Sequence, residues 1–165
     1  MSTTANAHAV PGLEMHRIIY ASVAAHPWRD SELEEMLLKW RRSNKRLGIT
    51  GMLVNHEQSF LQLLEGPAPA LNALFARLRV DAHHHKVVLL LREKINGRAF
   101  DDWTMGFARV SGEELRSMPW MADFLRRGMT LQQLAPRRAL DFLTAFREGP
   151  LSSVCLRAIS DAAES

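Results

Sequence analysis

A glutamine inside an otherwise apolar stretch constrains how this chain can fold. Residues 59–66 (SFLQLLEG) have the character of a buried strand, yet Gln62 places a side-chain amide in its middle. A second apolar stretch, residues 17–23, contains Tyr20, the single tyrosine of the chain. A buried polar group without a partner costs about 1–3 kcal/mol, and both side chains can donate and accept hydrogen bonds. We therefore expect a hydrogen-bonded site within the core.

The length of 165 residues and the apolar content of 47% fit one domain with a core of its own, extended by a short helical appendix. The longest apolar run, residues 87–91, is far shorter than the roughly 20 residues that a membrane-spanning helix needs. Residues 1–14 have no basic start followed by an apolar stretch, so we expect a disordered tail there and no signal peptide. A single cysteine, Cys155, rules out an intramolecular disulfide and fits a reducing, cytoplasmic setting.

The positive charge of the chain is spread along its length. The formal net charge is +3. Clusters of basic residues at 41–46, 126–127 and 137–138 read as solvated helix ends, because positive charge is favourable near a helix C-terminus. The pattern therefore disfavours a nucleic-acid partner, and we expect no association with a membrane.

Hydrophobic spacing and turn residues predict an α+β domain followed by helices. Strands are expected at 16–23, 49–54, 59–65, 87–94 and 104–110, and helices at 30–46 and 67–81. This βαββαββ order predicts, for residues 15–110, a sheet that contains antiparallel pairs and carries both helices on one face. Residues 111–165 are expected to form a helical extension that covers the other face, toward which Leu61 and Leu63 point.

Each of the two predicted helices presents a polar residue on its apolar stripe near its C-terminal end. Asn44 follows Trp40 by four residues, and Asp81 continues the stripe of the second helix. On the sheet, the side chains of Tyr20 and Gln62 point toward these helices. Four polar side chains thus converge between two helices and a sheet. Either they satisfy one another and ordered water, or a polar ligand with apolar rings fills the space, as in many cofactor pockets.

Motifs of several other ligand classes are missing from the sequence. It has no GxGxxG dinucleotide fingerprint, no GxxxxGK[ST] phosphate loop and no CxxC pair. The three consecutive histidines at 83–85 cannot all face one ion on a regular element, so we expect no metal site. We interpret them as a polar turn before the strand at 87–94.

Five short segments carry a resemblance to a known family. They are residues 19–22 (IYAS), Asn44 with 48–53 (GITGML), 60–66 (FLQLLEG), Asp81 with His84, and 103–107 (WTMGF). In this order and spacing they resemble the BLUF family, blue-light sensors that use flavin, over about residues 15–110. The resemblance implies a ferredoxin-like sheet with the flavin held between the two helices, where the four polar side chains converge.

The resemblance implies a photochemical pair. Tyr20 would be the electron and proton donor, and Gln62 would bridge Tyr20 and the flavin at N5 and C4=O. Asn44 would hold the polar edge of the ring, and Ser22 belongs to the same flavin-binding set. The residue types suit this chemistry, because a phenol can be oxidised with loss of its proton and a primary amide can relay that proton. The amide would then return rotated or as a different tautomer, and the sequence leaves both open.

The same resemblance assigns roles to residues outside this pair. Asp81 and His84 would contact the ring edge or the ribityl chain of the flavin. Trp103 and Met105 match a pair on the last strand whose surroundings change on illumination. Through this pair, the change at Gln62 would pass to the C-terminal helices.

One position departs from the family pattern. The family often has an arginine before the histidine of the second helix region, whereas this chain has Asp81-Ala82-His83-His84. An arginine there would offer a fixed positive charge to a flavin phosphate. The resemblance implies FAD as the cofactor. Because this arginine is missing, we expect either that FMN and riboflavin are accepted as well, or that His83 makes flavin binding more pH-dependent.

The resemblance is to short BLUF proteins that carry no enzyme domain. The 55 residues at 111–165 are too few for a cyclase, so we expect a photosensor that is not an enzyme. It would signal to a downstream protein partner or through a homo-oligomer. The first alternative is a flavin-free protein-interaction module of the same fold. A hydrolase of acyl phosphates would need an arginine-bearing phosphate loop after the first strand, which is missing, and a DNA-binding role rests only on the arginine pairs.

Overall fold

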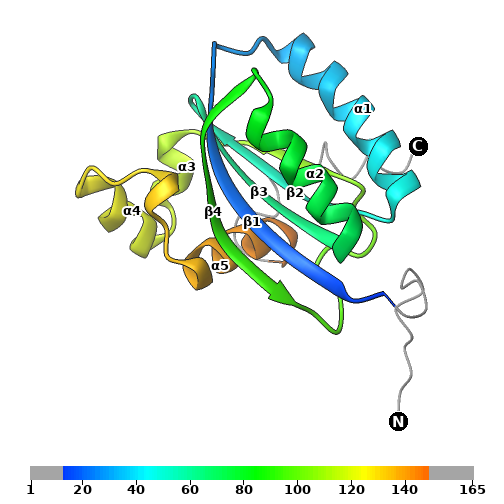
Figure 1. Cartoon of the computed structure of the whole chain (residues 1–165). Helices are drawn as coiled ribbons and strands as arrows, with labels where there is room; N and C mark the ends of the chain where they lie inside the picture. Colours follow the sequence, from blue (N-terminus) through cyan, green and yellow to red (C-terminus); the bar gives the residue numbers. More distant parts are fainter. Residues whose placement is uncertain (1–12, 149–165) are drawn as a thin grey trace.

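The computed structural model describes residues 13–148, which form one five-stranded sheet with helices on both faces (Figure 1). The strands are β1 (Met15–Ala24), β2 (Thr50–His56), β3 (Ser59–Pro67), β4 (His84–Lys94) and β5 (Gly106–Arg109). Their order across the sheet is β4-β1-β3-β2-β5. The first four strands pair antiparallel, and β5 adds to β2 in parallel. The expected α+β, ferredoxin-like sheet is confirmed.

The helices divide between the two faces of the sheet. The first pair is α1 (Asp30–Leu47) and α2 (Ala68–Val80), and the later helices are α3 (Gly112–Arg116), α4 (Pro119–Arg126) and α5 (Pro136–Glu148), with a short 3-10 turn at Leu131–Gln133. Figure 1 shows α1 and α2 on one side and α3 to α5 on the other. Within the described residues, α3 to α5 therefore cover the face that α1 and α2 leave bare, as expected.

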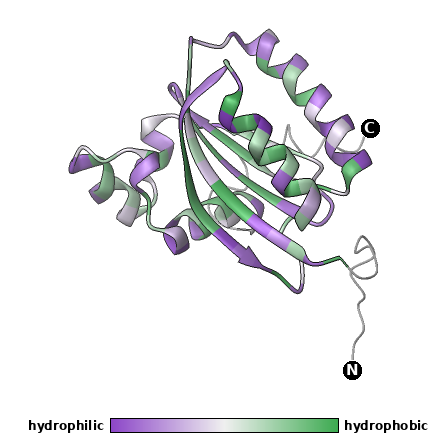
Figure 2. Cartoon of the chain, in the orientation of Figure 1, coloured by the Kyte–Doolittle hydropathy of each residue, from purple (hydrophilic) through white to green (hydrophobic). Residues whose placement is uncertain are grey.

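The alternation of side chains along β3 gives the molecule two separate cores. Phe60 and Leu64 pack with the apolar residues of α1 and α2, whereas Leu61 and Leu63 pack with residues of the C-terminal helices. Figure 2 shows hydrophobic residues concentrated in the sheet and hydrophilic residues along much of α1. Because successive strand residues point to opposite faces, the glutamine of β3 belongs to the core under α1 and α2.

The last strand is shorter than expected, and the difference changes where two candidate site residues lie. We predicted a strand from 104, but β5 begins at Gly106, so Trp103 and Met105 lie before it and not on it. A side chain at position 106 would not fit, because a Cβ there would lie 2.2 Å from the Trp103 ring and 2.7 Å from Met52 Sδ. The Trp103 ring thus lies directly against Gly106, and residues 101–105 form an irregular segment before the strand.

Two other boundaries differ from the sequence-based expectation. β4 begins at His84, so His84 and His85 belong to a strand and are not a turn before it. The turn between β2 and β3 is confined to Glu57 and Gln58, with Glu57 in the left-handed region at φ 54°. The part of the predicted helical extension at 149–165, which includes Cys155, lies outside the described residues, as does most of the predicted tail. Between residues 13 and 148, no helix is long and apolar enough to cross a membrane.

Candidate functional site

Tyr20 and Gln62 are direct partners across two neighbouring strands. They face each other in the register of β1 and β3, and both side chains are buried. The hydroxyl group of Tyr20 donates a hydrogen bond to Gln62 Oε1. The two polar residues that interrupt the apolar strands therefore satisfy each other, which explains how the core accepts them.

The other end of the Gln62 amide meets a sulfur atom. Gln62 Nε2 donates to Met105 Sδ over 3.3 Å, and Met105 is buried. In this arrangement the amide oxygen faces the Tyr20 hydroxyl and the amide nitrogen faces the thioether. A thioether is a weak acceptor, so this side of Gln62 is held less firmly than the side that faces Tyr20.

The surroundings of Tyr20 keep its proton on the phenol. Burial, assisted by the negative charge of Asp81, raises the pKa of Tyr20 far above its ordinary range. The ring of Phe75 on α2 packs against Tyr20, with 5.8 Å between ring centroids. Tyr20 is therefore a neutral hydrogen-bond donor over the whole physiological pH range.

Two side chains of α1 hold the segment before β5. Asn44 Nδ2 donates to the carbonyl oxygen of Thr104 over 2.8 Å, and Arg41 Nε donates to that of Met105 over 3.0 Å. Our interpretation of residues 41–46 as a solvated helix end is wrong for Arg41, whose exposed fraction is only 3%. Its spacing of four residues after Leu37 and three before Asn44 places it on the buried stripe of α1, and that spacing was the available signal.

Ser22 and His84 form a second polar contact on the same face of the sheet. Ser22 Oγ lies 3.2 Å from His84 Nδ1, and the ring of Phe60 packs edge-on against the imidazole at 5.5 Å. Burial lowers the pKa of His84, an effect that Asp81 partly offsets. A neutral imidazole is therefore the prevailing form of His84 at neutral pH.

Asp81 lies at the rim of the site and bonds locally. Its carboxylate accepts from the backbone N–H of His83 over 2.9 Å and lies 2.7 Å from His83 Nδ1. Although burial acts to raise it, these contacts with His83 hold the pKa of Asp81 below its ordinary value. Of the four polar side chains expected to converge, the structure brings Tyr20, Gln62 and Asn44 into the buried space and leaves Asp81 at its edge.

The space between α1, α2 and the sheet contains a small cavity. Its lining consists of Trp40, Asn44, Gln62, Leu64, Leu74, Leu78 and Met105. The volume of about 20 Å³ is enough for about one water molecule. α2 lies close against the strands, whereas α1 stands further from the sheet (Figure 1).

These residues fit a flavin by chemistry, because apolar walls surround two side-chain amides. Since Asn44 Nδ2 donates to Thr104, its Oδ1 remains to accept from an imide N–H. The cavity volume shows that a flavin ring would enter only with outward movement of the side chains of α1 and α2. Within residues 13–148, no group of three or more histidine, cysteine, aspartate or glutamate side chains converges to hold a metal ion.

Trp103 and Met105 lie on opposite faces of the sheet. Met105 joins the core under α1 and α2, whereas Trp103 joins the core under the C-terminal helices. There the indole packs against Phe100, with ring centroids 5.5 Å apart. On a regular strand, residues two apart would share a face. The irregular segment before Gly106 separates the two side chains that the sequence presented as a pair.

Comparison with known proteins agrees with this geometry. The chain is 31% identical over 133 residues to the photoactivated adenylate cyclase subunit beta of Euglena longa, a match that covers 78% of this chain and 15% of that protein. It is 30% identical over 83 residues to the blue light- and temperature-regulated antirepressor BluF of Escherichia coli, covering 50% of this chain and 21% of that protein. These matches therefore span only a small part of each relative.

Solved structures share the fold over most of the chain. The dark state of BlrB, a BLUF protein, superposes with a TM-score of 0.66 at 28% identity, covering 86% of this chain and 98% of that chain. The ground state of BlsA gives a TM-score of 0.67 at 25% identity, covering 79% and 86%. Residues 15–106 match the family described as sensors of blue-light using FAD. This match spans more than half of the chain, so the protein belongs to the BLUF family of blue-light flavin sensors.

Proposed function

We propose that this chain is a blue-light photoreceptor that binds FAD non-covalently between α1 and α2, with Tyr20 as electron and proton donor and Gln62 as the proton relay. The observation that carries the proposal is the buried cross-strand pair, in which the Tyr20 hydroxyl donates to Gln62 beside the cavity under the two helices.

The flavin would supply absorption of blue light and an excited state that takes up an electron. Asn44 would accept from the ring through Oδ1, because its Nδ2 is committed to Thr104. Ser22 and His84 would border the ring on the sheet side, and Asp81 would do so at the rim. His84 is then a neutral hydrogen-bonding group, in agreement with its lowered pKa.

Tyr20 is suited to lose its electron and its proton together. Burial disfavours both the phenolate before the reaction and a retained proton on the oxidised ring, since each is a charged species in a site of low polarity. The negative charge of Asp81, which raises the pKa of Tyr20, also favours removal of an electron. The proton has a path ready, because the hydroxyl already points at Gln62 Oε1.

Gln62 would then convert proton transfer into a lasting change of hydrogen bonding. Its amide nitrogen is held by the thioether of Met105, and the weakness of that bond makes reorientation inexpensive. An amide that turns or tautomerises exchanges its donor for an acceptor on the Met105 side. The resulting change at Met105 is a local hydrogen-bond event that biases a neighbouring element, the usual form of a protein switch.

The flavin form and the output follow from two further features. His83 stands where the family often has arginine and is engaged by Asp81, so FMN and riboflavin would also be accepted. The C-terminal helices form the second layer and would pass the signal to a partner protein or to a second copy of the chain. A photosensor of this kind needs no catalytic domain of its own, and a single cysteine among 165 residues agrees with work in a reducing cytoplasm.

A flavin-free interaction module of the same fold is the second candidate. It is favoured by the cavity of only about 20 Å³ and by the mutual satisfaction of Tyr20 and Gln62. In that case the two side chains would serve only to close the core.

An absorption spectrum of the purified protein in the dark, after blue light and during recovery separates the two candidates. We expect a flavin spectrum that shifts slightly to the red and reverts. Tyr20→Phe should keep the bound flavin and lose the shift, whereas Ser117→Ala, which removes a hydroxyl group next to α3, should behave as wild type. A protein that stays colourless after reconstitution with FAD would leave the flavin-free module, and a normal shift in Tyr20→Phe would remove the assigned role of Tyr20.

A further inference from the structure

The segment that carries Met105 is held by β2 and α1 through three consecutive carbonyl groups. Gly51 N–H donates to Trp103 over 2.8 Å, Asn44 donates to Thr104 over 2.8 Å, and Arg41 donates to Met105 over 3.0 Å. With each peptide group fixed in turn, a displacement of Met105 cannot be absorbed within one residue. It must be passed along the backbone toward Trp103.

On the opposite face, the same segment is held by one side chain of α5. Arg147 Nη2 lies 2.7 Å from Asp102 Oδ1 and 3.1 Å from Asp101 Oδ1. The Arg147 guanidinium carbon lies 5.5 Å from the centre of the Trp103 ring and 6.0 Å from that of Phe100. The Arg147 side chain is 23% exposed, so it combines two ion pairs with two aromatic contacts in a mostly buried setting.

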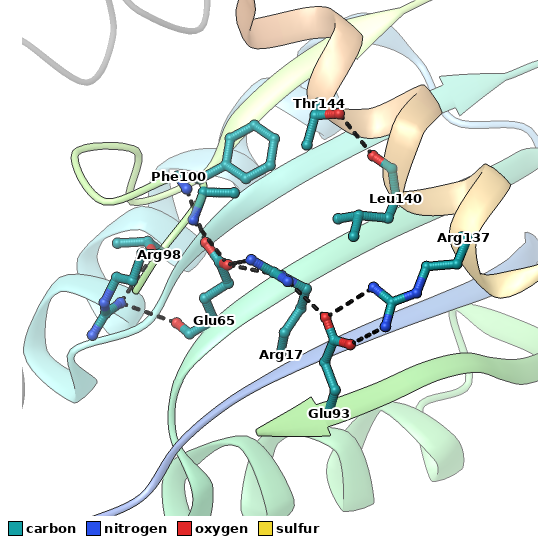
Figure 3. A network of polar contacts seen from close by, with 10 residues as sticks. Arg17, Glu65, Glu93, Arg98, Phe100, Arg137, Leu140 and Thr144 are labelled. Carbon is teal, nitrogen blue, oxygen red and sulfur yellow. Dashed lines mark hydrogen bonds and ion pairs between the residues drawn. The ribbon is translucent and has the colours of Figure 1, made fainter. Parts of the chain in front are cut away.

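The other end of α5 is held by a separate set of charges, which Figure 3 shows. Arg137 Nη2 lies 2.7 Å from Glu93 Oε2, and Arg17 Nη1 lies 2.7 Å from Glu93 Oε1. Arg17 also pairs with Glu65, which is fully buried. The N-terminal end of α5 is thus attached to the sheet, whereas its C-terminal end is attached to the segment that leads to Met105.

We propose that Arg147 is the positioning residue through which the state of Gln62 is passed to α5, with Asp101, Asp102 and Trp103 as the contacts that it senses. This inference rests on the proposed function, because it requires a light-driven change at Gln62. The order of contacts is Gln62 to Met105, Met105 to Trp103 along the fixed backbone, and Trp103 to Arg147. A guanidinium bound to two carboxylates and stacked near two rings depends on geometry, since its donors form a rigid planar fork.

Coupling through Arg147 would be reciprocal in free energy, so a change at Arg147 would also shift the free energy of the red-shifted state relative to the dark state. A structural role alone would change only the stability of the fold. The lifetime of the red-shifted state and the light-dependent hydrogen exchange of residues 136–148 are therefore the discriminating measurements. They test coupling directly and do not rely on the continuity of contacts.

The experiment compares the full-length flavin-loaded wild type with Arg147→Gln, Arg147→Lys and Arg138→Gln. Arg138 is a matched control, because it lies on α5 with its guanidinium carbon 5.1 Å from the Trp120 ring centre and has no contact with the Met105 segment in the described residues. Arg147→Gln should keep the dark spectrum and the size of the red shift. It should change the recovery rate by about fivefold or more and remove the light-dependent exchange difference in α5.

The remaining variants test whether the planar guanidinium group and its position on α5 are both required for coupling. Arg147→Lys keeps a positive charge without the planar fork and should restore the coupling in part, while Arg138→Gln should match wild type in both measurements. A wild-type exchange difference in α5 that persists in Arg147→Gln would overturn the inference and leave the photoreceptor intact. A wild-type red shift without any exchange difference in α5 would do the same. No red shift in the wild type would overturn the proposed function and the inference with it.

Discussion

Gln62 and Glu65 lie on the same strand but on opposite faces of the sheet, and their surroundings differ in kind. Gln62 has a hydroxyl donor on one side and a weakly accepting thioether on the other. Glu65 accepts from two nitrogens of Arg17 and from the backbone N–H groups of Ala99 and Phe100, at 2.7 to 3.0 Å. The Gln62 amide therefore has one weak hydrogen bond that it can exchange, whereas the Glu65 carboxylate has strong donors on both oxygens.

We call Gln62 with its partners Tyr20 and Met105 the movable site. Glu65 with its partners, Arg17 and the backbone at 99–100, is the fixed site. A network of charge-assisted hydrogen bonds in which every donor is used is costly to rearrange, because any change leaves a buried charge without a partner. An amide between a phenol and a thioether gives up only one weak hydrogen bond on the thioether side when it changes its arrangement. The face under α1 and α2 can therefore change state while the face under α5 keeps the sheet and the segment at 99–100 in place.

The largest expected effect comes from breaking the fixed site. Glu65→Leu keeps a similar volume but removes the acceptor for two backbone N–H groups and one partner of Arg17. We expect the free energy of unfolding to fall by about 3–5 kcal/mol, the usual cost of breaking one side of a buried ion pair. Urea unfolding measures it, with Glu35→Gln on the exposed side of α1 as the control. A loss below about 1 kcal/mol would show that Glu65 is no more fixed than Gln62.

A smaller loss of stability is expected at the movable site, together with a complete loss of its response. Gln62→Leu leaves the Tyr20 hydroxyl without its acceptor, which should cost about 1–3 kcal/mol in unfolding free energy. The light-induced red shift should vanish in the same variant, while Gln58→Leu in the exposed turn should retain it. A reversible shift of normal size without Gln62 would contradict the role assigned to the amide.

The smallest expected effect is a pH dependence of stability that arises from Glu93, which shares Arg17 with the fixed site. Burial acts to raise the pKa of Glu93, but hydrogen bonds from Arg137 and Arg17 and their positive charges prevail and lower it below its ordinary value of 4.5. A carboxylate whose pKa falls on folding stabilises the fold fully above its unfolded pKa, and this contribution is lost as the pH falls through the folded value.

Comparing wild type with Glu93→Gln isolates this contribution from other titrating groups. The difference in unfolding free energy should be constant at neutral pH and shrink once the pH falls below about 4.5, the ordinary glutamate pKa. Urea titrations at a series of pH values would measure it. A difference that grows toward acid pH would mean that the arginines do not favour the ionised form of Glu93.

The sequence predicted the movable site better than the fixed one, for a physical reason. Tyr20 and Gln62 each interrupt a continuous apolar run, so their burial followed from the run and the face that they share from the alternation of strand side chains. The partners of Glu65 lie 34 to 48 residues away along the chain, and two of them are backbone groups, which leave no trace in residue type. Such contacts become visible only when the strands are in register.

For two residues, the prediction from sequence pattern was wrong or incomplete. Arg41 was assigned to the solvent because it stands in a run of basic residues, yet helical spacing buries it against Met105. Trp103 and Met105 were expected to act as a pair on the last strand, but they lie on opposite faces of the sheet. The strand begins only at Gly106, where the Trp103 ring leaves no room for a Cβ, and no local propensity for a strand or a turn indicates such a close approach.

The position of the segment at 100–105 also has a consequence for the modularity of the protein. The region shared with the family ends at residue 106, directly after Met105, whereas α5 belongs to the part that follows. The helices of the second layer can therefore be exchanged in a chimera without altering any residue that surrounds Gln62. A helix transplanted in place of α5 would need a cationic side chain that can contact Asp101, Asp102 and the Trp103 ring, as Arg147 does. These three residues therefore define which helices can replace α5.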